Sequence, residues 1–197
     1  MRPHVAAAVT LAFGTAIALP LHAQRPAPRP VAWQVAAAVT PLPSEQKAGA
    51  AVLGYNASGK LVQLRAATNQ MICLAPDPAQ KTFHSACYHR SMEPFMARGR
   101  ALRAQGMKEN QVDTVRFAEV KSGKLKMPTQ PAMLYQIFGG TFNEKTGTVT
   151  GGRPLYVTYI PFATEKSTGI SATPTDKGPW LMLPGTPKAH IMFSADR

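Results

Sequence analysis

Residues 51–74 read AVLGYNASGKLVQLRAATNQMICL, and this stretch decides the fold class. It contains three runs rich in apolar and β-branched residues, at 51–55, 61–64 and 71–74, and each run has the length of a strand. A short loop at 56–59 ends in glycine and separates the first two runs, which is typical of a β-hairpin. The loop also contains a glycosylation sequon, N-A-S, but we interpret it as a turn. The sequence therefore predicts a sheet in this part of the chain.

A helix is predicted next, over residues 92–105. Ser91 is a favourable N-cap, Pro94 fits the first helical turn, and Gly106 ends the pattern. Apolar residues recur within the helix at spacings of three and four. Gly99 lies on the same face, where glycine weakens a helix by about 1 kcal/mol. We therefore expect Gly99 to permit the close approach of a neighbouring strand.

A second helix is expected over residues 110–122, and the last third of the chain returns to strand patterns separated by prolines. These strands and one hairpin are predicted at residues 133–138, 139–152, 155–162, 180–183 and 189–193. The whole pattern predicts an α+β fold with an antiparallel or mixed sheet, one or two covering helices and one disulfide bond. We expect a single domain over residues 36–197.

The beginning of the chain has the pattern of an export signal. Arg2 precedes an apolar run, and residues 21–23 form an A-x-A-like cleavage site, so we expect a signal peptide at residues 1–23. A proline-rich tether is expected at residues 24–35. The apolar run contains Pro20 and no second long apolar segment follows, so we expect no transmembrane segment in the mature chain. The predicted location is periplasmic or secreted.

Cys73 and Cys87 are the two cysteines of the chain. In an oxidising compartment such an even pair predicts a disulfide bond. Closing a loop of about 15 residues stabilises a fold by roughly 3 kcal/mol in the chain-entropy model. The alternative is a thiol nucleophile or metal ligand, because His84 and His89 lie close in sequence.

The chain is strongly basic, with a formal net charge of +12. Removal of the predicted signal peptide leaves 12 − 1 = +11, because Arg2 is its one charged residue. Such an excess favours anionic partners, for example lipid head groups, cell-wall polymers, polyanionic glycans or nucleic acid. We identify Arg98, Arg100 and Arg103 as candidate anion-binding residues, the alternative being a solvated helix face. Nucleic acid is disfavoured as a partner because exposed aromatic residues are not interleaved with the basic ones.

Four residues form a candidate metal site: His84, His89, Glu93 and His190. Imidazole and carboxylate ligands suit zinc, copper or iron. His190 can join the other three only through folding. The alternative is that the histidines make structural hydrogen bonds at the junction of a strand and a helix. We expect no resident cofactor, and a transition metal is the open alternative.

Four segments of the chain resemble a group of uncharacterised secreted bacterial proteins. These segments are residues 69–74 (NQMICL), 87–89 (CYH), 94–100 (PFMARGR) and 184–192 (PGTPKAHIM). The resemblance covers most of the chain after Ala36. It implies export and a single domain, and it transfers no activity and no functional residue.

No catalytic motif is assembled in the sequence, and whether the protein is an enzyme is left open. A nucleophile elbow, a phosphate-binding loop and a haem-attachment motif are all missing from the sequence. We favour a non-catalytic, exported, soluble domain that binds an anionic cell-envelope component or a small ligand. The basic helices or an aromatic pocket of Tyr156, Tyr159 and Trp180 would supply the contacts. The alternative is an exported metal-dependent hydrolase or redox enzyme that uses the histidine-rich site.

Overall fold

The structure, a computed structural model, describes residues 26–174 and 178–194. The predicted signal peptide, residues 1–23, lies outside the described residues. In the described part of the chain, one sheet of eight strands has the order β2-β1-β3-β4-β5-β8-β10-β9. The strands are β1 (Ala51–Tyr55), β2 (Leu61–Arg65), β3 (Met71–Leu74), β4 (His84–His89), β5 (Ala132–Phe138), β8 (Arg153–Tyr159), β9 (Trp180–Met182) and β10 (His190–Ser194).

The sheet is mixed, as the sequence predicts. Strands β1 and β3 pair in parallel, and all other neighbours in the sheet pair antiparallel. A small hairpin of β6 (Thr141–Asn143) and β7 (Thr148–Thr150) extends the connection between β5 and β8. Strand β8 lies between β5 and β10, so both of its edges are paired, as expected for a central strand.

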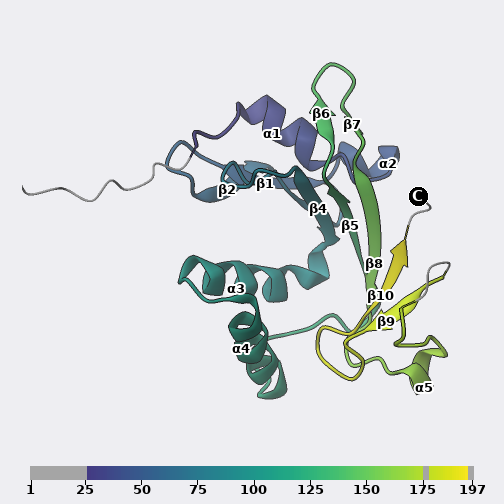
Figure 1. Ribbon diagram of the computed structural model, residues 1–197. Helices are drawn as coiled ribbons and strands as arrows, with labels where there is room; N and C mark the ends of the chain where they lie inside the picture. Colours follow the sequence, from purple (N-terminus) through teal and green to yellow (C-terminus); the bar gives the residue numbers. More distant parts are fainter. Residues whose placement is uncertain (1–25, 175–177, 195–197) are drawn as a thin grey trace, which may run out of the picture.

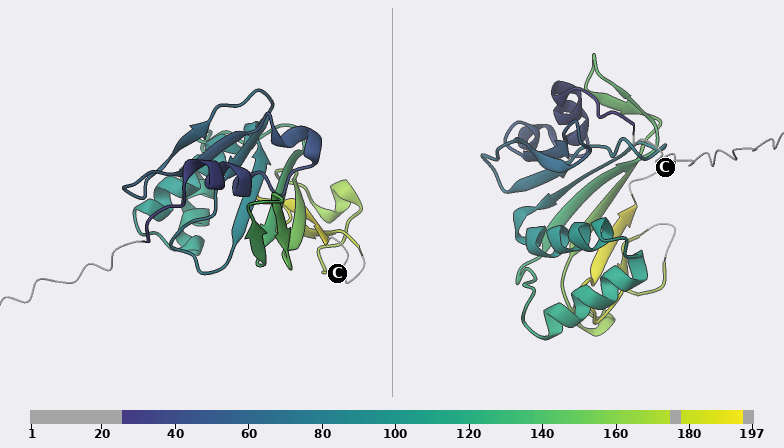
Figure 2. Two further views of the ribbon diagram at one scale, coloured as in Figure 1. Left: turned by 90° about the horizontal axis from the view of Figure 1, so that it is seen from above. Right: turned by 90° about the vertical axis from the view of Figure 1, so that its left-hand side faces the viewer.

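Helices cover both faces of the sheet. The sheet is bent, and α3 (Glu93–Ala104) and α4 (Glu109–Lys121) lie inside the bend (Figure 1). Helix α1 (Val31–Ala38) and the short α2 (Ser44–Lys47) lie on the other side of β1 and β2. The right-hand view of Figure 2 shows α3 and α4 in front of the sheet. No helix among residues 26–174 and 178–194 has the length and apolar character needed to cross a membrane.

Helix α1 corrects the predicted boundary between tether and domain. The tether was expected to extend to residue 35, but α1 begins at Val31 and packs on the sheet. Gln34 is buried, its amide nitrogen donates to the Tyr55 carbonyl at 3.0 Å, and its amide oxygen accepts from the Tyr55 nitrogen at 2.7 Å. These two bonds satisfy the backbone at the end of β1, so the packed domain begins before residue 36.

The start of α3 also differs from the prediction. A 3-10 turn, η1 (Arg90–Met92), precedes the helix, and α3 begins at Glu93 with Pro94 in its first turn. Ser91 therefore lies inside η1 and is not the N-cap of α3. Its backbone nitrogen donates to the ring of His89 at 3.3 Å.

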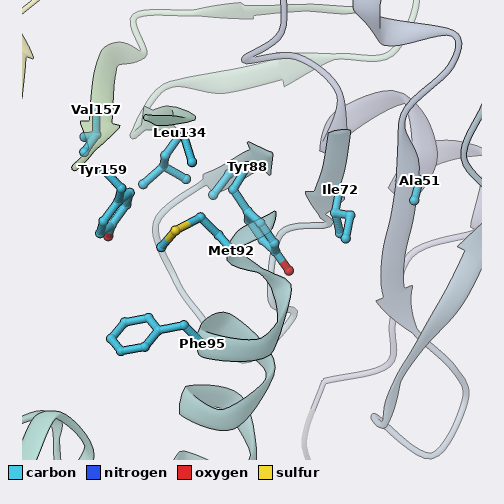
Figure 3. Packing of buried hydrophobic residues seen from close by; sticks show 10 residues of the cluster. Ala51, Ile72, Tyr88, Met92, Phe95, Leu134, Val157 and Tyr159 are labelled. Carbon is cyan, nitrogen blue, oxygen red and sulfur yellow. The ribbon is translucent and has the colours of Figure 1, made fainter. Parts of the chain in front are cut away.

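The core inside the bend is built by alternate residues of the strands. Leu134, Val157 and Tyr159 project from β5 and β8 toward Met92 and Phe95 (Figure 3). Because side chains alternate across a sheet, one face packs on α3 and α4 while the other packs on α1. The face inside the bend is therefore the one that positions the site described below.

The predicted disulfide bond is confirmed. Cys73 and Cys87 are directly opposite one another on the antiparallel strands β3 and β4, with a Cα–Cα distance of 4.0 Å. Both are fully buried on the α1 side of the sheet, in a cluster with Ala38, Val39 and Leu42. The cross-link therefore ties together two central strands rather than a surface loop.

Candidate functional site

A cleft of about 330 Å³ lies between the sheet face inside the bend and helices α3 and α4. This volume is at the low end of the range for small-molecule sites. Its apolar lining comes from the sheet and from α3: Leu74, Ala86, Leu134 and Met96. Its polar lining includes four cationic side chains, which are Arg100, Arg103, Arg116 and Lys188. We name this space the basic cleft.

Arg116 is the most unusual residue of the basic cleft. It comes from α4, and its side chain is only 3% exposed. Its guanidinium lies over the Phe95 ring at 3.9 Å, donates to the Phe95 carbonyl at 3.2 Å and pairs with Asp113 at 2.5 Å. Its Nε has no hydrogen-bond partner among the described residues. A buried cation that keeps an unused donor is costly, and an anion in the cleft would lower that cost.

Gly99 leaves space for the Arg116 side chain. The expectation that Gly99 permits the close approach of a strand is therefore wrong. A Cβ at Gly99 would lie 2.8 Å from Nη1 of Arg116. The close neighbour of Gly99 is therefore the guanidinium from α4. The glycine weakens α3 locally but permits the buried arginine to cross it.

Gly99→Leu is expected to destabilise the protein by about 1–3 kcal/mol, because the larger side chain must displace the Arg116 guanidinium from its fixed position. Thermal unfolding measures the effect. Ala101→Leu is the matched control, since Ala101 is exposed on the same helix. Equal melting temperatures for the two variants would contradict this assignment of Gly99.

Cations outnumber carboxylates at the α4 end of the basic cleft. Arg103 and Glu109 share two hydrogen bonds of 2.9 Å. The Lys188 ammonium lies 2.9 Å from Asp113 and 3.7 Å from Glu109. Together with Arg116, three cations there meet two carboxylates within the described residues, which leaves one positive charge.

The same contacts keep both carboxyl groups ionised. The hydrogen bond from Arg103 lowers the pKa of Glu109, and Lys188 adds to the effect. Burial alone would raise the pKa of Asp113, but hydrogen bonds from Lys188 and Arg116 outweigh it and hold that pKa below its usual value. Both carboxylates therefore stay ionised and paired with the cations at neutral pH, and the one excess positive charge remains.

Tyr159 offers a free donor next to these charges. Its side chain is buried and lines the basic cleft, and its hydroxyl bonds to no other described residue. Burial raises the pKa of Tyr159 to about 12, so the hydroxyl stays protonated. The hydroxyl can therefore donate to a bound oxyanion without changing its charge.

His190 lies beside Tyr159, with ring centroids 5.1 Å apart. Its Nδ1 lies 2.6 Å from the Lys188 carbonyl, so that nitrogen carries the proton and donates. Burial lowers the pKa of His190. The imidazole is consequently neutral at neutral pH and adds no charge to the site.

A closed triad occupies the other end of the cleft. The Tyr88 hydroxyl donates to Glu93 at 2.5 Å and accepts from Arg100 at 2.8 Å, while Arg100 pairs with Glu93 at 2.6 Å. Burial raises the pKa of Tyr88 above its usual value. These three side chains satisfy one another, so this end is better suited to shaping the cleft than to proton transfer.

The three candidate anion-binding arginines have different positions. Arg100 and Arg103 line the basic cleft. Arg98 does not line it and makes a bidentate pair with Glu119 of α4 at 2.5–3.0 Å. A helical face that looks uniform in sequence is thus divided by the fold.

The four candidate metal ligands are not brought together. His84 and His89 are five residues apart on β4, and an odd separation in a strand places them on opposite faces. His84 stacks on Phe138 with a centroid distance of 4.3 Å, and Glu93 is held by the triad. His190 is three strands away from β4. Within residues 26–174 and 178–194, no three His, Cys, Asp or Glu side chains are grouped for a metal ion.

Two cationic residues of the site were not predicted from the sequence. Arg116 lies four positions after Val112, which is on the buried face of α4, so its position on an apolar stripe was the available signal. Lys188 lies 75 positions from its partner Asp113, and no local pattern indicates that pair.

Comparison with protein-family models, with curated proteins and with solved structures finds no match to this chain. The resemblance to secreted bacterial proteins therefore stays a prediction.

Proposed function

We propose that the protein is a non-catalytic binding protein, exported to the periplasm or secreted, whose basic cleft holds a small ligand with an anionic group and an apolar body. The observation that carries the proposal is the buried Arg116 guanidinium with an unused Nε, which lines the same cleft as the Tyr159 hydroxyl. A carboxylate accepts hydrogen bonds from both kinds of donor.

The composition of the cleft supports an amphipathic ligand. Apolar side chains from β3, β4 and β5 line one part of it, and the excess positive charge lies toward α4. Burial of apolar ligand surface is favourable by about 25 cal/mol per Å², while the charge selects the anionic end. The anionic end of the ligand would therefore lie toward α4 and its apolar body against the sheet.

A binding role also fits the titration behaviour of the site. The pKa values of Tyr88 and Tyr159 are both raised, so neither hydroxyl is activated as a base or a nucleophile at neutral pH. Export is supported by the disulfide bond, which is stable in oxidising compartments, together with the signal pattern of the sequence.

2-Naphthoate, compared with the uncharged 2-naphthamide, is a direct probe of the proposal. We expect naphthoate to bind and naphthamide to bind at least tenfold more weakly, because the amide lacks the charge-assisted hydrogen bonds. Isothermal titration calorimetry measures both affinities. Equal affinities, or no binding of either compound, would overturn the anionic-ligand proposal.

Arg103→Gln should weaken naphthoate binding about tenfold, since one charge of the cleft is removed. Arg98→Gln is a closely matched control: both arginines come from α3, and each makes a bidentate pair with a glutamate of α4. Only Arg103 lines the cleft. Tyr159→Phe should weaken binding without loss of packing, because it removes the hydroxyl alone. An equal effect of the two arginine substitutions would show that the cleft is not the binding site.

A further inference from the structure

Two exposed apolar residues at one end of the molecule have an unusual backbone conformation. Phe162 follows β8 with φ of 65° and is 53% exposed, and Leu183 follows β9 with φ of 53° and is 40% exposed. Bulky residues rarely adopt positive φ, and such strain persists only where the surrounding structure imposes it. In this strained conformation the two large apolar side chains are exposed to solvent.

Hydrogen bonds between the two loops hold this conformation. The Phe162 nitrogen donates to the Thr186 carbonyl at 2.9 Å, and the Gly185 nitrogen donates to the Ala163 carbonyl at 2.7 Å. The Thr186 nitrogen donates back to the Leu183 carbonyl at 3.2 Å. The two loops are therefore one rigid unit, which we name the apolar tip (residues 160–163 and 183–186).

A groove of about 470 Å³ adjoins the apolar tip. It is lined by Phe162, by Val120 in the last turn of α4, and by Leu125 and Met127 of the segment that follows this helix. It shares no lining residue with the basic cleft. The loops of the apolar tip lie at the end of the molecule that carries α4 and α5 (Glu165–Thr168) (Figure 1).

Exposed lysines flank this end. Gly123, with φ of +75°, ends α4, and the Leu125 nitrogen donates back to the Glu119 carbonyl at 3.0 Å. This turn packs Leu125 on the core and leaves Lys121, Lys124 and Lys126 exposed. Glu119, the last carboxylate of α4, is already paired with Arg98.

We propose that this end of the protein docks on an anionic lipid bilayer. Phe162 and Leu183 enter the boundary between head groups and acyl chains, and the flanking lysines contact lipid phosphates. Apolar side chains surrounded by lysines match such an interface, because it offers negative charge at the surface and hydrocarbon just below it. A protein partner is the competing occupant, and the vesicle experiment decides between them.

Co-sedimentation with lipid vesicles tests the docking surface. The exported protein is mixed with vesicles of phosphatidylglycerol and phosphatidylcholine, and separately with pure phosphatidylcholine vesicles. We expect binding to the anionic vesicles, weakened by high salt, and little binding to the neutral ones. Failure to bind phosphatidylglycerol vesicles at low salt would overturn the proposal and leave a protein partner as the occupant.

Phe162→Asn and Leu183→Asn are the informative variants, since asparagine tolerates positive φ and the fold is kept. We expect the double variant to partition about tenfold or more weakly. Val31→Ser is the matched control, because Val31 is 54% exposed on α1, away from this end. Lys124→Gln and Lys126→Gln should each weaken binding roughly fivefold.

Equal vesicle binding by the double variant and the wild type would show that charge alone attracts the protein and would overturn the role of the apolar tip. Naphthoate affinity is measured on the same variants. It should be unchanged, because the apolar tip does not line the basic cleft. The two proposals can therefore fail independently.

Discussion

Phe95→Ala should lower the free energy of unfolding by about 3–5 kcal/mol, the largest effect expected for a single substitution in this protein. Phe95 is 1% exposed and lies in the core inside the bend, opposite Tyr159 (Figure 3). Its removal leaves a cavity that the surrounding backbone cannot fill. The Arg116 guanidinium, 3.9 Å above the ring, loses its support as well. Urea unfolding measures the change.

Phe95→Leu separates the effect of lost core packing from the effect of losing the aromatic ring beneath Arg116. Leucine fills most of the cavity, so the stability loss should be smaller, but it gives Arg116 no aromatic face. We expect Phe95→Leu to retain the fold and to weaken naphthoate binding. A Phe95→Ala variant as stable as the wild type would contradict the packing described for α3.

The double substitution Cys73→Ala/Cys87→Ala should cost about 3 kcal/mol, as expected for opening a loop of roughly 15 residues. Both sulfur atoms are buried, so alanine leaves little room for solvent, and the change acts chiefly on the unfolded chain. Differential scanning calorimetry of the variant and of the wild type, each with and without reductant, measures the effect.

Reductant should lower the melting temperature of the wild type and leave that of the double variant unchanged. The sheet side of the basic cleft should weaken too, because Leu74 and Ala86, which line it, are the immediate sequence neighbours of Cys73 and Cys87 and pair with each other. A double variant that melts with the wild type would show that the cross-link does not stabilise β3 and β4.

Much of the fold was predictable because its strands and helices carry local patterns. Strands β1, β2 and β3 and the helices α3 and α4 are confirmed at nearly the predicted positions. Strand β4 was missed because its sequence, HSACYH, has histidines at both ends and no β-branched residue. The histidines suggested metal ligands, whereas the four residues between them, 85–88, are buried in a central strand.

The site was predictable only in part. Arg100 and Arg103 belong to one helix, and their charge and spacing are visible in the sequence. The position of Lys188 depends on the loop after β9 returning to α4, which is a tertiary contact. The candidate metal-binding histidines do not lie together, because their positions depend on strand alternation and on the order of the strands. Neither property can be read from local sequence spacing.

The order of the strands has a consequence for how the protein folds during synthesis. Strand β10 comes after every other described strand along the chain, yet it lies inside the sheet, where β8 and β9 both pair with it. A chain that is synthesised from its N-terminus therefore cannot complete the sheet until β10 is available. Until then one edge of β8 stays unpaired, and an unpaired edge strand is prone to aggregation.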